Sequence, residues 1–263
     1  MKAIVFLGLV LAVAVAAAGC TGGTTPSGTP ATDGGVNETL ALFAGGSGTL
    51  LNATDADVSQ AAARLGRTGL AGPAADAILL NVSRSAGFVV DAVTYGPDGR
   101  VAAAAPARYS SLVGTNLTDA TTPADFYTMA YLGPYDQLAE GFWGVALGHP
   151  VTDANNTTVG GVSIAIRPEL LLKGPADAAR GTRSLVLFGV QTDGTILYAD
   201  DPALVGKQMS LPGTGLAGLA TQIIETPSGV ATHHPANAAA DRTVAWQTAG
   251  LHGTEWRLVV AQR

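Results

Sequence analysis

Residues 88–117 read FVVDAVTYGPDGRVAAAAPARYSSLVGTNL, and this stretch sets the fold class. Two apolar runs, at 88–94 and 100–104, flank a turn that contains Asp98-Gly99. Because glycine adopts the positive φ that a tight turn needs, the arrangement predicts a hairpin of two antiparallel strands. A short polar segment follows the hairpin and ends in a Val113-Gly114 step.

The same order of features returns about 92–95 residues later, as in an internal repeat. Apolar residues at 185–191 and 195–198 flank Asp193-Gly194, and the step Val205-Gly206 follows. The second half of the chain therefore predicts a second hairpin like the first.

Helical periodicity precedes the first hairpin. Apolar residues recur at helical spacing from Val58 to Leu65, and the side-chain oxygens of Thr54 and Asp55 suit an N-cap, so we expect a helix to begin there. A second helix is expected after Gly72-Pro73. Further strands are expected at 145–149, 160–166, 243–248 and 255–261, and further helices at 168–181 and 215–224.

Composition excludes several functions. The 263 residues carry a formal charge of −6, and only 13% of them are charged. A chain of this charge lacks the basic surface that nucleic acids or anionic membranes require, so no nucleic-acid partner is expected. A single cysteine excludes an internal disulfide and a zinc site built from cysteines, since each needs at least two thiols.

That cysteine, Cys20, directly follows the apolar run Ile4–Ala18, which is too short to cross a bilayer as a helix. The end of the run resembles the lipobox of bacterial and archaeal lipoproteins, in which the cysteine becomes the lipidated first residue. An uncleaved anchor and a plain secretory signal are the alternatives. Residues 21–36 read as a Thr/Gly/Pro spacer, so the folded body is expected outside the cytoplasm, anchored to the cell membrane by lipid.

Motifs for catalysis and for cofactors are weak. Gly213–Gly218 matches G-x-G-x-x-G but does not follow a buried strand, and His233-His234 would point to opposite faces of a strand. No motif for hydrolysis is present. The sequence predicts no catalytic residues, no cofactor and no metal site.

Aromatic residues concentrate in one segment, where six of the chain's 15 fall within residues 126–143. Tyrosine and tryptophan combine an apolar face with a hydrogen-bonding tip, which suits the wall of a small-molecule pocket. The alternative is that these rings pack the segment onto the sheet.

The order of all these motifs resembles a double Cache sensor domain over roughly 40–263. The first half carries Val113–Leu117, Gly148-His149-Pro150-Val151 and Gly160-Gly161-Val162, and the second carries Thr192–Lys207 and Gly253–Val260. The resemblance implies an α+β fold of two PAS-like modules, each an antiparallel sheet flanked by helices, on one long N-terminal helix. It also implies that a ligand binds in the membrane-distal module.

On this basis we expect a lipoprotein signal peptide at 1–20, the spacer at 21–36, a membrane-distal module at 37–167, a connecting helix at 168–183 and a membrane-proximal module at 184–263. Each module is expected to have its own separate hydrophobic core. The family usually precedes an output domain, which we do not expect in this chain because it ends at Arg263.

In the resembled family the aromatic segment forms the lid over the ligand, and an arginine there commonly binds an amino-acid carboxylate. This chain has no Lys or Arg between Thr118 and Trp143 but has several carboxylates. We therefore expect an amine or neutral ligand, because aromatic faces attract cations. The expected ligand-binding residues are Tyr127, Tyr131, Tyr135, Asp136, Trp143 and His149.

These observations predict a small-molecule-binding, sensor-type protein that is not an enzyme and that acts with a membrane signalling or transport partner. A solute-binding lipoprotein that serves a transporter and a structural protein of the cell envelope are the alternatives.

Overall fold

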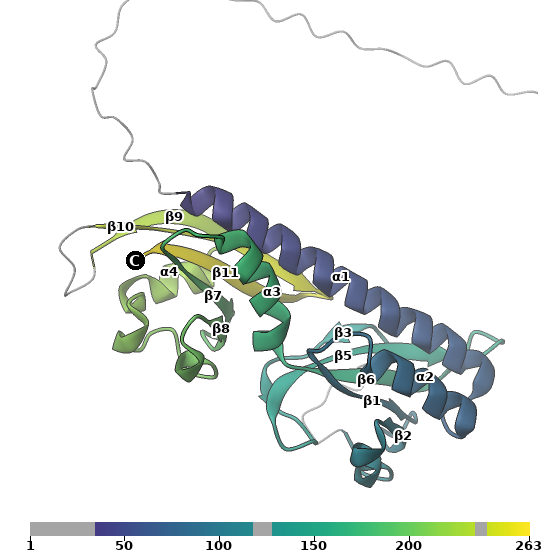
Figure 1. Cartoon of the computed structure of the whole chain (residues 1–263). Coiled ribbons are helices and arrows are strands. Elements are labelled where there is room, and N and C mark those ends of the chain that lie inside the picture. The colour runs from purple at the N-terminus through teal and green to yellow at the C-terminus, as the bar shows by residue number, and fades with distance from the viewer. Residues whose placement is uncertain (1–34, 118–127, 235–240) are drawn as a thin grey trace, which may run out of the picture. The chain divides into compact units, whose positions relative to one another are not determined.

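The computed structural model describes residues 35–117, 128–234 and 241–263 (Figure 1). The predicted signal peptide and spacer, with Cys20, lie outside these residues, as does Tyr127. The α-helices are α1 (Val36–Thr68), α2 (Pro73–Ser83), α3 (Pro168–Arg180) and α4 (Ala220–Glu225), and short 3₁₀ turns lie at Ala107–Leu112, Pro202–Leu204, Pro212–Thr214 and Ala217–Leu219. No helix in this part of the chain is long and apolar enough to span a membrane.

The first sheet has six strands, all paired antiparallel, in the order β2-β1-β6-β5-β3, with β4 paired to β5. Its strands are β1 (Val89–Tyr95), β2 (Val101–Ala105), β3 (Tyr131–Leu132), β4 (Asp136–Gln137), β5 (Trp143–Thr152) and β6 (Thr158–Ile166). The predicted hairpin at 88–104 is confirmed as β1 and β2.

The second sheet has five antiparallel strands in the order β8-β7-β11-β10-β9. They are β7 (Leu185–Gln191), β8 (Ile196–Ala199), β9 (Ser228–His233), β10 (Arg242–Leu251) and β11 (Thr254–Gln262). Two antiparallel sheets with an N-terminal helix confirm the predicted α+β fold.

Equivalent hydrogen bonds support the internal repeat. The amide of Gly114 donates to the carbonyl of Val101 at 2.9 Å, and the amide of Gly206 donates to the carbonyl of Ile196 at 2.8 Å. Both glycines have positive φ, 86° and 78°, so the Val-Gly step reverses the chain in the same way behind both hairpins. The repeated pattern in the sequence thus corresponds to a repeated local structure.

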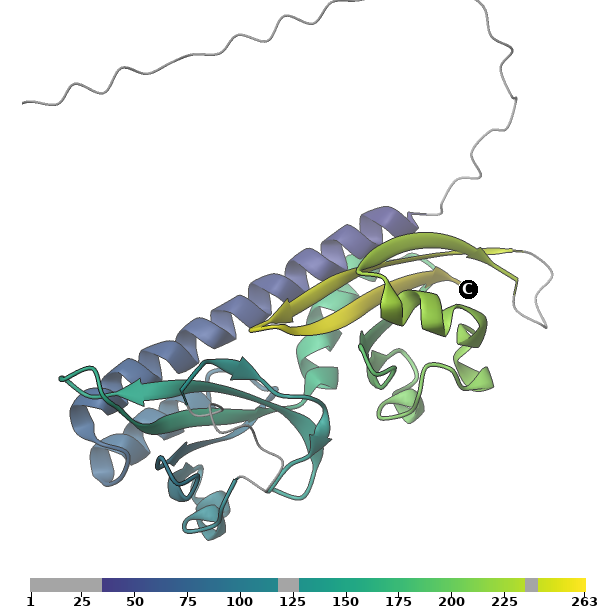
Figure 2. The ribbon, with the colours of Figure 1, turned by 180° about the vertical axis from the view of Figure 1, so that it is seen from behind.

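Helix α1 begins at Val36, so the prediction that the first helix starts at Thr54 was wrong. Thr54 lies within the helix, where its hydroxyl donates to the carbonyl of Leu50 at 2.8 Å instead of capping a helix end. Buried residues continue N-terminal to it, including Val36, Phe43 and Leu51, because this part of the helix packs against α3 and the second sheet (Figures 1 and 2).

A continuous apolar core follows α1. One cluster of buried side chains contains Phe43 of α1, Leu147 of β5, Leu172 of α3 and Trp256 of β11. The expectation of two separate cores was therefore wrong: the sheets are separate, but α1 joins their inner faces. A smaller cluster, which includes Trp246, covers the opposite face of the second sheet.

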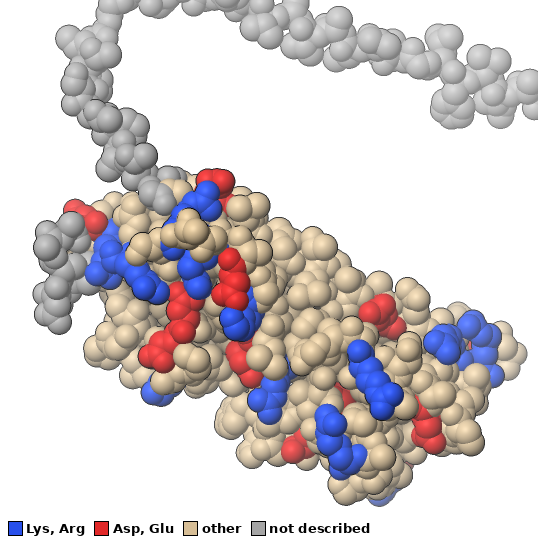
Figure 3. Space-filling model, in the orientation of Figure 1, with Lys and Arg blue, Asp and Glu red and all other residues tan. Residues whose placement is uncertain are grey.

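Charged side chains are sparse on the face of the molecule in Figure 3, where acidic and basic residues alternate on a mostly uncharged surface. The view agrees with the low charged fraction of the sequence and shows no extended basic patch on this face.

The closest approach of α1 to the first sheet depends on Gly66. A Cβ at this position would lie 2.0 Å from the carbonyl oxygen of Thr152, at the end of β5. Gly66→Ala should therefore lower the free energy of unfolding by about 1–3 kcal/mol through overpacking. Gly45→Ala, on the same helix with nothing within 4 Å of the new Cβ, should instead raise it by about 0.5–1 kcal/mol through helix propensity. Urea denaturation of both variants checks the opposite signs, and equal effects would contradict the packing.

Candidate functional site

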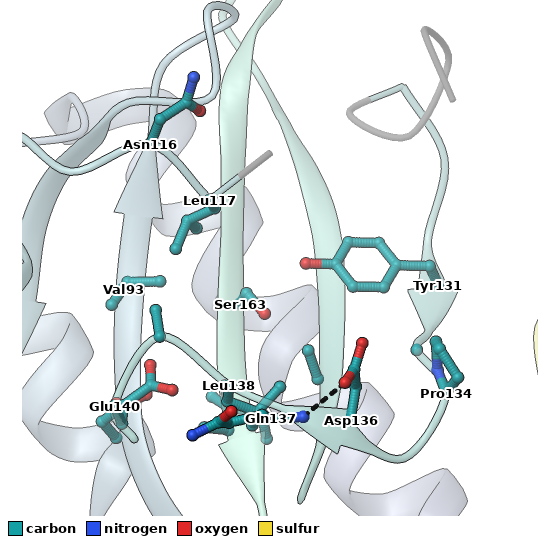
Figure 4. Close-up of a pocket in the computed structure, with 16 residues that line it drawn as sticks. Val93, Asn116, Leu117, Tyr131, Pro134, Asp136, Gln137, Leu138, Glu140 and Ser163 are labelled. Atoms are coloured by element: carbon teal, nitrogen blue, oxygen red, sulfur yellow. Dashed lines mark hydrogen bonds between the residues drawn. The ribbon is translucent and has the colours of Figure 1, made fainter. Parts of the chain in front are cut away.

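A pocket of about 420 Å³ lies on the first sheet, beneath the segment that carries β3 and β4 (Figure 4). Residues of β1, β5 and β6 form its floor, and Leu117 together with the residues that follow β4 forms part of its wall. In Figure 4 the ring of Tyr131 extends into the pocket from one side, and Val93 and Leu117 lie on the other. The mixture of apolar walls and a few polar groups suits a small ligand.

The strand period places a carboxylate in the floor. On β1, Asp91 and Val93 are two residues apart and therefore share the face that lines the pocket. Asp91 has no exposed surface, and among the described residues neither of its carboxyl oxygens has a hydrogen-bonding partner. A buried carboxylate without a partner is costly, so this group needs a proton or a bound cation.

Burial is the main cause that raises the pKa of Asp91 to about 8, and the neighbouring carboxyl of Glu140 raises it further. The backbone of Ala165 and the positive charge of Arg108 act in the opposite direction. At neutral pH the group therefore holds its proton.

Two more carboxylates line the pocket, Asp136 of β4 and Glu140 in the following turn. One oxygen of Asp136 accepts a hydrogen bond of 2.7 Å from the backbone amide of Gln137, which fixes the side chain in the orientation drawn in Figure 4. None of the described lining residues is a lysine or an arginine. The electrostatic environment thus favours a positive ligand over a negative one.

A glycine determines where the ring of Tyr131 lies. Tyr131 of β3 pairs with Gly148 of β5, and a Cβ on Gly148 would come within 2.5 Å of the ring. Because glycine leaves that space free, the ring of Tyr131 lies over β5. From there the ring extends into the pocket (Figure 4).

Of the residues expected to bind ligand, Tyr131 and Asp136 line this pocket. Tyr135 and Trp143 do not; their rings pack against each other at 5.8 Å, and 55% of Trp143 is exposed. Tyr127 lies outside the described residues.

His149 lies elsewhere, where β5 meets α1. Its Nε2 is 2.7 Å from Oδ1 of Asp55, and Nε2 of His252 lies at the same distance from that oxygen. Burial raises the pKa of Asp55, but the hydrogen bonds to His252 and His149 outweigh burial, so the pKa falls below its ordinary value. Since an ionised carboxylate only accepts hydrogen bonds, both imidazoles donate to it.

Asp91 was not among the residues predicted from the sequence, although its place in an apolar run is unusual. The residue interrupts the apolar run Phe88–Val93 of a predicted strand, and a carboxylate in a buried strand must be paired, protonated or used. The aromatic residues at 126–143 instead indicated the segment above the sheet, and not the strands that form the floor of the pocket.

Comparisons with known proteins give one family match and several matches to solved structures. Residues 49–168 match the family described as "HK/GC/Chemotaxis protein-like, sensor domain". This range contains the first sheet and the pocket. No curated protein sequence matches the chain.

Solved structures match most of the chain. An extracellular ligand-binding receptor from Desulfohalobium retbaense DSM5692 has a TM-score of 0.74 and 26% identity; the match covers 86% of this chain and 39% of that one. The chain therefore spans less than half of that receptor's length.

Two chemoreceptor domains from Pseudomonas also match. The ligand-binding domain of CtaA from Pseudomonas fluorescens, in complex with L-alanine, has a TM-score of 0.59 and 18% identity over 88% of this chain and 96% of that one. The domain of the amino acid chemoreceptor PctB from Pseudomonas aeruginosa PAO1, in complex with L-Gln, has a TM-score of 0.58 and 16% identity over 86% and 89%. The chain has the fold of these extracellular ligand-binding sensor domains.

Proposed function

We propose that this protein is an extracytoplasmic, lipid-anchored binding protein of the sensor type, and that its first sheet binds a small cationic ligand. The observation that carries the proposal is the buried, unpartnered carboxyl of Asp91 in the floor of a pocket that also holds Asp136 and Glu140. A cation placed there would pair with the buried carboxyl of Asp91.

An ammonium group fits this environment well. It would meet the carboxylates of Asp91 and Asp136, and the ring of Tyr131 would offer its negative face to the same charge. An α-amino acid would also need a cation for its carboxylate, which the described lining lacks. We therefore favour amines and quaternary ammonium compounds over amino acids and dicarboxylates.

The comparisons support binding, not catalysis. The matched family and structures are sensor and receptor domains, and the two Pseudomonas domains were solved with amino acids bound. We infer that the chain divides into a ligand-binding module at 37–167 and a second module at 184–263, joined by α3. We also infer that ligand binding is passed to a membrane signalling or transport partner.

Calorimetry on the full chain tests the ligand class. We expect an amine such as putrescine or choline to bind, and succinate not to bind. Asp91→Asn should weaken amine binding by at least about tenfold, because it removes the buried charge. Tyr131→Leu should weaken it by less, and Trp143→Ala, outside the pocket lining, should leave it unchanged. Tight binding of succinate, or amine binding indifferent to Asp91→Asn, would contradict the proposal.

Amine affinity should also depend on pH. Below about pH 8 Asp91 is protonated and must release its proton when a cation binds, so affinity should rise from pH 6 to pH 8.5. Titrations at both values check this in the wild type. A cation held by exposed carboxylates alone would bind equally well at both.

The same carboxyl makes stability depend on pH. Its pKa is higher in the folded state than the usual 3.8, so between about pH 4 and 8 the folded protein binds more protons than the unfolded chain, and stability falls as pH rises. Without ligand, the wild type should lose roughly 2–5 kcal/mol between pH 5 and 9 relative to Asp91→Asn. Denaturant unfolding at pH 5, 7 and 9 measures the difference. Asp57→Asn, at an exposed position of α1, is the control. Parallel profiles for wild type and Asp91→Asn would exclude the buried carboxyl as the cause.

Lipid anchoring needs its own test, since Cys20 lies outside the described residues. Cys20→Ser should abolish incorporation of labelled fatty acid and move the protein out of the detergent phase. Unchanged labelling would reject the lipoprotein assignment.

A further inference from the structure

Three potential metal ligands meet where α1 runs from the second sheet to the first (Figures 1 and 2). Asp55 comes from α1, His149 from β5 of the first sheet, and His252 from the turn that joins β10 and β11 of the second. The sequence separations are 94 residues from Asp55 to His149 and 197 to His252. The site is distinct from the pocket at Asp91, because none of its three residues lines that pocket.

The three ligand atoms already point to one place. Both Nε2 atoms lie 2.7 Å from Oδ1 of Asp55, the imidazole rings meet edge to face with centroids 5.5 Å apart, and all three atoms lie within 4.8 Å of one another. A tetrahedral zinc ion with bonds of about 2.0–2.1 Å separates neighbouring ligand atoms by roughly 3.4 Å. Small rotations of the side chains would therefore open the cluster enough to admit the ion.

The chemistry of the set is that of a first-row transition metal. Two neutral imidazole nitrogens and one carboxylate oxygen are common ligands of zinc, and the single negative charge complements a divalent cation. The side chains of His149, Asp55 and His252 are 14%, 20% and 23% exposed, so the site is largely shielded but an ion in solution can reach it.

His252 lies in the tight turn that joins β10 and β11. His252 has φ 51° and Gly253 has φ 84°, so both central residues of this two-residue turn are left-handed. Asn-Gly is the sequence that such turns favour, and non-glycine residues in this conformation are uncommon. Histidine is among the few non-glycine residues enriched in this conformation. Here its side chain reaches Asp55 of α1 and His149 of the first sheet.

We propose that Asp55, His149 and His252 form a binding site for a zinc-type divalent cation, held by one carboxylate oxygen and two imidazole nitrogens, with water as the remaining ligand. Because the ligands come from α1 and from both sheets, the bound ion would tie the β10–β11 turn to β5. Metal binding should therefore raise the thermal stability of the whole folded body.

The test uses the full chain without an affinity tag, dialysed against metal-free buffer and titrated with zinc sulfate by calorimetry. We expect one Zn²⁺ per chain and a higher melting temperature. His252→Asn should weaken zinc binding by at least about tenfold while keeping the turn, since asparagine tolerates the left-handed conformation. His149→Gln should do the same from the other sheet. Circular dichroism of each variant verifies that it folds.

His234→Asn is the matched control. His234 also pairs with an aspartate, Asp241, at 2.8 Å, but this pair is exposed and has no third ligand in the described residues. Its substitution should leave zinc binding unchanged. The absorption of bound Co²⁺ identifies the ligands, because a thiolate band would assign the metal to Cys20. Such a band, the absence of stoichiometric zinc, or equal affinity in wild type and His252→Asn would each overturn the proposal.

Discussion

The packing of α1 against both sheets is the constraint on which the rest of the structure depends. The helix buries residues from Val36 to Leu65, and α3 approaches it so closely that a Cβ at Gly46 would lie 3.3 Å from Pro175. At its other end Gly66 touches the backbone of Thr152. Helix α1 also packs against β5 of the first sheet and β10 of the second, which places β5 and the β10–β11 turn near the same stretch of α1. The pocket and the histidine cluster are both built on this frame.

The pocket shows how a sheet with both faces covered can hold a binding group. The inner face of the first sheet belongs to the core along α1, and the outer face would be as apolar without Asp91. Burial of the ionised form of this carboxyl opposes folding, which is why its pKa is raised. The segment with β3 and β4 covers the carboxyl and adds further acidic groups.

The histidine cluster follows a different logic, because its members are joined only by the tertiary fold. The sequence patterns placed Asp55 at a helix cap and His149 at a ligand contact near the end of a strand, and they gave no role to His252. Each local interpretation considered only neighbours in sequence. The register of β5 and the position of the β10–β11 turn bring the three side chains to one point. Local patterns carry no information about such distances.

Short-range periodicity and turn residues such as Gly99 and Gly194 were enough to predict the hairpins, the helix that follows Arg167 and the closing strands, and the family resemblance added the α+β class. It also identified Tyr131 and Asp136, which do line the pocket. Only the tertiary structure decided that α1 begins at Val36, that Trp143 faces outward and that Asp91 lies buried beneath the lid. Each of these features depends on whether a side chain is buried. Burial is set by contacts between residues that are distant in sequence, so local patterns do not reveal it.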